Sequence, residues 1–67
     1  MIIKKVTIKN HSTISFVEVM KTIEELLMSS DFNKQLEKSS EGVVEYLHST
    51  CYYKVLKNGA INFEIFS

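Results

Sequence analysis

The sequence of 67 residues contains no proline and no arginine, only one cysteine and only two glycines. The lone cysteine, Cys51, excludes an internal disulfide and is typical of a protein kept in a reducing compartment. Without arginine, the chain lacks the side chain that makes bidentate contacts to phosphate and guanine. Because the formal net charge is also zero, a strongly basic nucleic-acid-binding domain is disfavoured.

Long hydrophobic runs are also missing. No stretch approaches the roughly 20 apolar residues that a membrane-spanning helix requires. The first ten residues, MIIKKVTIKN, have no apolar run of signal-peptide length after a basic start. We therefore expect a cytoplasmic protein that has no membrane partner.

The composition is that of a folded chain, because 45% of the residues are hydrophobic and 24% are charged. Its length allows one domain, residues 1–67, near the lower limit of what a hydrophobic core supports without disulfides or metals. Association with another protein surface would therefore also help to stabilise the fold.

Local patterns predict two elements in the first half of the chain. Residues 2–9 alternate apolar and polar side chains with the period of a half-buried strand. Ser15 and Glu18 have the spacing of a capping box, and Ile14 with Val19 has that of a hydrophobic staple, so both devices indicate the same helix start. The apolar stripe of this helix, which should end near residues 28–30, contains Phe16, Val19, Met20, Ile23, Leu26 and Leu27.

The segment that follows is ambiguous. We expect a short helix over residues 31–38 and a second helix over residues 41–49, separated at Ser40. Gly42 and the closely spaced glutamates Glu41 and Glu45 disfavour one unbroken helix. The alternative ends a helix at Gly42 and makes the residues after it an extra strand.

Two strand-like runs flank Asn58-Gly59, a pair that favours a two-residue type I′ hairpin loop. With that loop, Lys57 opposes Ala60 and Tyr53 opposes Glu64. One face of the hairpin then consists of Tyr52, Lys54, Leu56, Ile61, Phe63 and Ile65, which we expect to pack on the helices. The other face, which we expect to be open to solvent, consists of Cys51, Tyr53, Val55, Lys57, Ala60, Asn62, Glu64 and Phe66.

The predicted fold class is α+β, a two-layer sandwich in which one strand is followed by two or three helices and a C-terminal hairpin. The three strands form one sheet, with the helices on one face. Residues 1–10 and 51–67 carry five lysines and one glutamate, a net charge of +4, whereas residues 11–50 carry three lysines and seven carboxylates, a net charge of −4. We therefore expect a basic sheet and acidic helices, a field that can orient a partner.

The open face of this sheet is the candidate binding site. A patch of aromatic and aliphatic side chains with a charged rim has the composition of a modest protein interface. It predicts a protein-binding module, an adaptor or inhibitor-like accessory protein, that can also form a homodimer or larger homo-oligomer through this face. The alternative is a single-stranded nucleic-acid binder, because lysines and aromatic rings on an open sheet can contact phosphates and bases. The binding residues expected for either function are Lys5, Lys9, Tyr53, Val55, Lys57 and Phe66.

Catalytic and metal-binding patterns are weak. His48 and Cys51 lie three residues apart, which on a helix would bring an imidazole near a thiol, but Cys51 falls where a strand should begin. His11 is expected in a loop, and two histidines with one cysteine lack the close-spaced ligand pairs of a zinc site. We therefore expect no enzymatic activity, no cofactor and no metal.

Overall fold

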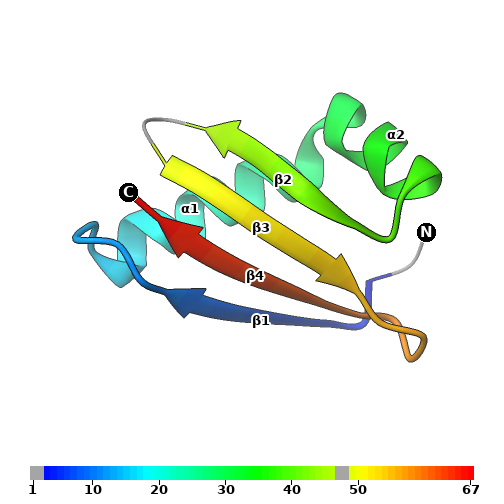
Figure 1. The fold of residues 1–67 in the computed structure, drawn as a ribbon, viewed down its shortest axis with the longest axis horizontal. Coiled ribbons are helices and arrows are strands. Elements are labelled where there is room, and N and C mark those ends of the chain that lie inside the picture. The colour runs from blue at the N-terminus through cyan, green and yellow to red at the C-terminus, as the bar shows by residue number, and fades with distance from the viewer. Residues whose placement is uncertain (1–2, 47–48) are drawn as a thin grey trace.

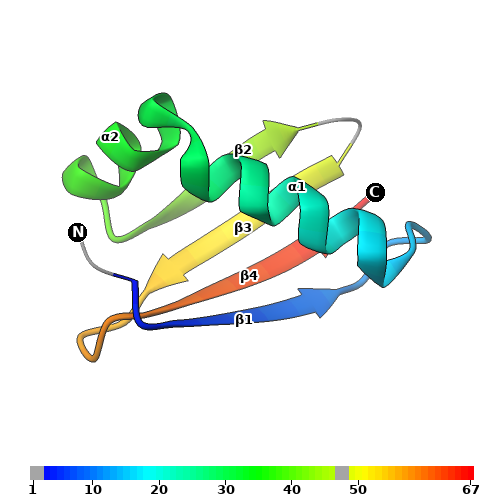
Figure 2. The same cartoon turned by 180° about the vertical axis from the view of Figure 1, so that it is seen from behind.

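The computed structural model describes residues 3–46 and 49–67, apart from the side chain of Tyr46. It shows an α+β fold in which a four-stranded sheet carries two helices on one face (Figures 1 and 2). The elements, in chain order, are β1 (Lys5–Asn10), α1 (Phe16–Met28), α2 (Ser30–Lys38), β2 (Glu41–Tyr46), β3 (Ser49–Val55) and β4 (Ala60–Phe66).

The sheet has the strand order β1-β4-β3-β2. Strand β1 pairs in parallel with β4, while β3 pairs antiparallel with both β4 and β2. It follows that β1, β4 and β2 run in the same direction and that β1 and β2 form the two edges. The helical crossover from β1 to β2 thus joins the two edge strands (Figure 2).

Serine side chains set the helix boundaries. Ser15 is the N-cap of α1, and its hydroxyl accepts a hydrogen bond from the backbone N–H of Glu18, which confirms the predicted start. Ser29 ends α1, where its N–H donates to the carbonyl of Leu26, and it also caps α2 by accepting from the N–H of Phe32. One residue therefore separates the helices, whose buried side chains are Val19, Ile23, Leu26, Phe32 and Leu36.

Residues 41–46 form strand β2 and not the helix that we expected. The alternative, an extra strand after Gly42, is confirmed for residues 43–46, while residues 47 and 48 lie outside the described part of the chain. Two physical reasons favour the strand. The β-branched pair Val43 and Val44 suits a pleated surface. Gly42, which has no side chain, allows β2 to pair closely beside Tyr53, because an added Cβ would lie 2.8 Å from the tyrosine hydroxyl oxygen.

The hairpin between β3 and β4 has a three-residue loop, so the predicted two-residue loop is wrong. The N–H of Leu56 donates to the carbonyl of Ala60, and the N–H of Gly59 donates back to the carbonyl of Leu56. Gly59 has a φ of 86°, the left-handed conformation that such three-residue loops require. Asn58 accepts a hydrogen bond from the N–H of Ala60 through its Oδ1 atom. The additional loop residue shifts the pairing of β3 by one position.

This shift reverses the faces of β3 relative to the prediction. Tyr53 pairs with Phe63 and is only 3% exposed, whereas Tyr52 pairs with Glu64 and is 51% exposed. The predicted inward face of β4 is confirmed, because Ile61, Phe63 and Ile65 are all buried, whereas Ala60, expected to be open to solvent, is only 6% exposed. The helix-facing residues of β3 are therefore Cys51, Tyr53 and Val55.

Tyr53 links the sheet to α2. Its ring contacts Phe32 edge-on, with ring centroids 5.2 Å apart. Its hydroxyl oxygen accepts a hydrogen bond of 2.9 Å from Nε2 of Gln35. Because the polar end of the buried tyrosine is satisfied, the residue fits a core position.

The charges are separated across the sheet and not between sheet and helices as we expected. Strand β2 contributes Glu41 and Glu45, so the four strands together carry three lysines and three glutamates. Lysines Lys5 and Lys9 lie on β1 at one edge, and the two β2 glutamates lie at the other. The reason for the difference is the reassignment of residues 41–46 from helix to strand.

Candidate functional site: the open face of the sheet

One face of the sheet is not covered by any helix in the described part of the chain (Figure 1). Side chains alternate along each strand, so the residues between the buried positions point to this open face. They are Lys5, Thr7 and Lys9 of β1, Asn62, Glu64 and Phe66 of β4, Thr50, Tyr52 and Lys54 of β3, and Glu41, Val43 and Glu45 of β2.

Three rings form an aromatic cluster on this face: His11, Phe66 and Tyr52. The imidazole of His11 stacks on Phe66, with ring centroids 4.7 Å apart and an angle of 13° between the planes. Tyr52 meets the same phenylalanine edge-on at 5.5 Å. These ring contacts hold the cluster together. It remains open to solvent, because Phe66 is 38% exposed.

The backbone explains why these rings meet. His11 directly follows β1, and its N–H donates a 2.8 Å hydrogen bond to the carbonyl of Ile65. This bond continues the β1–β4 ladder by one residue and brings the imidazole beside Phe66. Tyr52 lies diagonally from Phe66 across the β3–β4 pair, a distance that aromatic side chains can span.

A carboxylate borders the cluster. Glu64 lies opposite Tyr52 on the neighbouring strand, and its Oε2 atom is 3.8 Å from Nε2 of His11. Both side chains are nearly half exposed, so this contact is solvated and contributes little to stability. Glu64 gives the cluster one acidic side.

Tyr52 stands between two shallow hollows of the open face. One is lined by Thr50, Tyr52, Glu64 and Phe66. The other extends toward β2, where its lining includes Val43 and Lys54. Because apolar and polar side chains line both hollows, a partner side chain can be held on either side of the Tyr52 ring.

The structure brings together only part of the predicted binding set. Lys5 and Lys9 lie on the open face of β1, and Phe66 lies in the aromatic cluster. Lys57 is exposed in the hairpin loop. Tyr53 and Val55 face the helices, so the prediction that these two residues point outward is wrong.

Sequence reasoning missed Tyr52 and His11. The Asn-Gly pair fits a two-residue and a three-residue loop alike, and the two-residue loop predicts that Tyr52 faces the core. His11 was expected only to lie in a loop. The sequence feature that points to His11 is its position directly after a predicted strand, because the hydrogen bonds between paired strands can continue by one residue.

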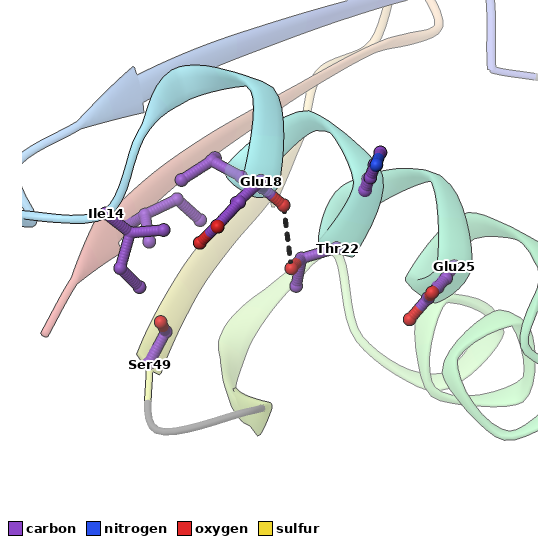
Figure 3. Close-up of a pocket in the computed structure, with 8 residues that line it drawn as sticks. Ile14, Glu18, Thr22, Glu25 and Ser49 are labelled. Carbon is purple, nitrogen blue, oxygen red and sulfur yellow. Dashed lines mark hydrogen bonds between the residues drawn. The ribbon is translucent and has the colours of Figure 1, made fainter.

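A separate hollow lies on the helical side, between α1 and the start of β3 (Figure 3). Its labelled residues are Ile14, Glu18, Thr22, Glu25 and Ser49, and the Thr22 hydroxyl donates a hydrogen bond to the Glu18 carbonyl. Of these, Ser49 is buried, whereas the two carboxylates are exposed to solvent. Exposed charged side chains and apolar side chains thus line this hollow together.

Cys51 lies in the core with no exposed surface. Burial raises the pKa of its thiol above the ordinary value of 9.0, so the neutral thiol is the stable form at neutral pH. His48, its suggested base, lies outside the described residues. Within the described part of the chain, no three His, Cys, Asp or Glu side chains gather in a way that could hold a metal ion.

Comparisons with protein-family models, with curated proteins and with solved structures found no match to this chain. In the part of the chain that the structure describes, neither helix is long and apolar enough to cross a membrane.

Proposed function

We propose that this chain is a protein-binding module, a small cytoplasmic adaptor or inhibitor-like accessory protein, that docks a partner protein on the open face of its sheet. The observation that carries the proposal is the aromatic cluster of His11, Tyr52 and Phe66 on a face that no described helix covers. A solvent-facing cluster of rings is costly to leave in water, and a partner surface would cover it.

The chemistry of the cluster suits protein recognition. Tyrosine and phenylalanine are enriched at the centres of protein interfaces, where they supply large contact area at a small cost in conformational entropy. The stacked and edge-on contacts already hold the three rings in place. Less ordering is therefore needed on binding, which favours affinity.

The surrounding charges support a protein partner over a nucleic acid. The open face carries three lysines and three glutamates, Lys5, Lys9, Lys54, Glu41, Glu45 and Glu64. Such a balanced rim is typical of a protein interface. A nucleic-acid site would need a clear excess of positive charge to neutralise phosphates.

Single-stranded nucleic acid remains the second candidate because Tyr52 and Phe66 expose ring surface near Lys54. Fluorescence anisotropy with labelled oligothymidylate, at low and at physiological salt, separates the two functions. We expect no binding at physiological salt. Tight binding that falls steeply with salt and is lost in Tyr52→Ala would replace the protein-binding proposal.

Affinity capture from an extract of the source cells, compared across variants, tests the proposal directly. The site variant is Tyr52→Ser combined with Phe66→Ser. The matched control is Val17→Ser combined with Met28→Ser, which removes two exposed apolar side chains of α1 away from the open face. Far-ultraviolet circular dichroism and urea unfolding verify that both variants fold.

We expect a partner that is captured by the unmodified chain and by the control but lost with the site variant. Binding of the purified partner, measured by calorimetry, should weaken at least about tenfold in the site variant, which is typical when an interface loses two aromatic anchors. A folded site variant that keeps every partner of the unmodified chain would contradict the proposal.

A further inference from the structure

The two edges of the sheet carry opposite charges on the same face. The basic edge is strand β1 with Lys5 and Lys9, and the acidic edge is strand β2 with Glu41 and Glu45. Each strand has six residues. No other strand in the described part of the chain pairs with the outer side of either edge, so the outer backbone groups of both edges are available for pairing.

The charged residues of the two edges have matching positions. Lys5 and Lys9 are four residues apart on β1, and Glu41 and Glu45 are four residues apart on β2. In a strand, this spacing places both members of each pair on one face. The open-face residue between them is Thr7 on the basic edge and Val43 on the acidic edge.

Strand direction determines how a second copy would fit. Because β1 and β2 run in the same direction, a copy shifted along the sheet brings its β2 beside β1 in parallel and keeps all helices on one side. In the register that pairs position 5 with position 41 of the copy, Lys5 lies beside Glu41 and Lys9 lies beside Glu45. Opposite charges at neighbouring positions of paired strands are stabilising.

Symmetric pairing of like edges is disfavoured by the same charges. Two antiparallel β1 strands centred on Thr7 would place Lys5 beside Lys9 in both halves of the contact. Two β2 strands centred on Val43 would place Glu41 beside Glu45. Like charges directly opposite each other are destabilising, so the edges favour a contact between unlike edges.

An apolar groove along the basic edge gives a second, independent reason for covering this side. It lies on the helical face between β1 and α1, where Val6, Phe16 and Met20 are all more than one-third exposed. Three further apolar side chains line it, together with one carboxylate: Ile8, Ile23, Leu27 and Glu24. A neighbouring copy placed beside β1 on the same side would reduce the contact of this groove with water.

We propose that copies of this chain associate head to tail, with the acidic edge of one copy paired to the basic edge of the next in a continuous parallel extension of the sheet. Such a contact is heterologous, so it adds further copies unless a ring closes. It uses the edges and leaves Tyr52 and Phe66 of the aromatic cluster, which lie on the two central strands, exposed in every copy. This association is therefore independent of the proposed protein binding. The assembly would present that binding surface repeatedly.

Sedimentation velocity of the full chain over a wide concentration range, together with two charge variants, tests this proposal. Lys5→Glu with Lys9→Glu makes both edges acidic, and Glu41→Lys with Glu45→Lys makes both edges basic. We expect the unmodified chain to grow beyond two copies at high concentration and each variant alone to associate at least about tenfold more weakly. An equimolar mixture of the two variants should regain association, because acidic and basic edges then meet again.

A matched control carries Lys21→Glu with Lys57→Glu, which changes the net charge as much as the first variant but touches neither edge strand. It should associate like the unmodified chain, and circular dichroism should show that all variants remain folded. A single-copy mass at the highest concentration, growth that stops at two copies, variants that associate unchanged, or a mixture that stays unassociated would each overturn the proposal.

Discussion

The two faces of the sheet place the same kinds of side chain in different surroundings. Tyr53 and Tyr52 are neighbours in sequence, yet the first is fixed beneath α2 by Phe32 and Gln35 and the second stands in solvent beside Phe66. In a chain this small, the covered face provides most of the hydrophobic burial. Stability and the proposed partner recognition can therefore be altered separately, one strand position at a time.

The sharpest test of this separation compares Phe63→Ala with Phe66→Ala. Phe63 is completely buried, so its truncation should lower the free energy of unfolding by about 3–5 kcal/mol, most of the stability of a small domain. Phe66→Ala should cost less than about 1 kcal/mol because the ring is partly exposed. Urea unfolding measures both values. Equal losses would show that the two faces contribute equally to the free energy of unfolding.

Gly42→Ala tests how closely the covered face is packed at the β2 edge. The new Cβ would lie 2.8 Å from the hydroxyl oxygen of Tyr53, whose ring cannot move without disturbing Phe32 and Gln35. We expect a loss of about 1–3 kcal/mol, as for other overpacked sites. Val43→Ala, one residue along the strand on the open face, serves as the control and should cost less.

A double-mutant cycle sharpens this prediction. Combined with Tyr53→Phe, which removes the contacting oxygen, Gly42→Ala should cost clearly less than in the unmodified chain. Thermal and urea unfolding of the four proteins give the coupling free energy. Additive losses would mean that the alanine is not limited by the tyrosine.

Gly59→Ala tests the loop that sets the faces of β3. Its φ of 86° is easily adopted by glycine but strained for alanine, so we expect a loss of about 1 kcal/mol. Gly59→Asn should cost less, because asparagine tolerates the left-handed region better than alanine does. Equal stability of all three proteins in urea would indicate a different loop conformation.

The smallest expected effect is on the free energy of unfolding at alkaline pH, through the buried thiol of Cys51. Burial raises the pKa of Cys51 in the folded chain, so on raising the pH the thiol of the unfolded chain ionises first. The thiol's contribution is thus constant below its ordinary pKa of 9.0 and falls as the pH rises above it. Compared with Cys51→Ala, the unmodified chain should lose up to about 1 kcal/mol more over the first pH unit above that value. Parallel pH profiles in urea unfolding would contradict the buried placement.

Several features could be predicted from sequence because local chemistry determines them. The capping box at Ser15 marked the start of α1, and the apolar alternation of Ile61, Phe63 and Ile65 assigned the faces of β4. Both signals involve residues close in sequence. They did not depend on how distant parts of the chain meet.

Other features depended on contacts that local patterns do not encode. Both Tyr52 and Tyr53 are large and partly apolar, so the inward face of β3 followed only from the loop length, and Asn58-Gly59 fits two lengths. Strand β2 was ambiguous because its few residues suit a helix or a strand until pairing with β3 decides. The aromatic cluster and the opposite edges both result from these two long-range pairings.

Tyrosine nitration with tetranitromethane, read residue by residue by mass spectrometry, tests the central claim that β3 has Tyr52 on the open face and Tyr53 in the core. The folded chain should be modified at Tyr52, while Tyr53 should react only after unfolding in urea. A Tyr53 that reacts in the folded chain as fast as Tyr52, or faster, would contradict the assignment of the two faces and remove the basis for the proposed docking of a partner on the aromatic cluster.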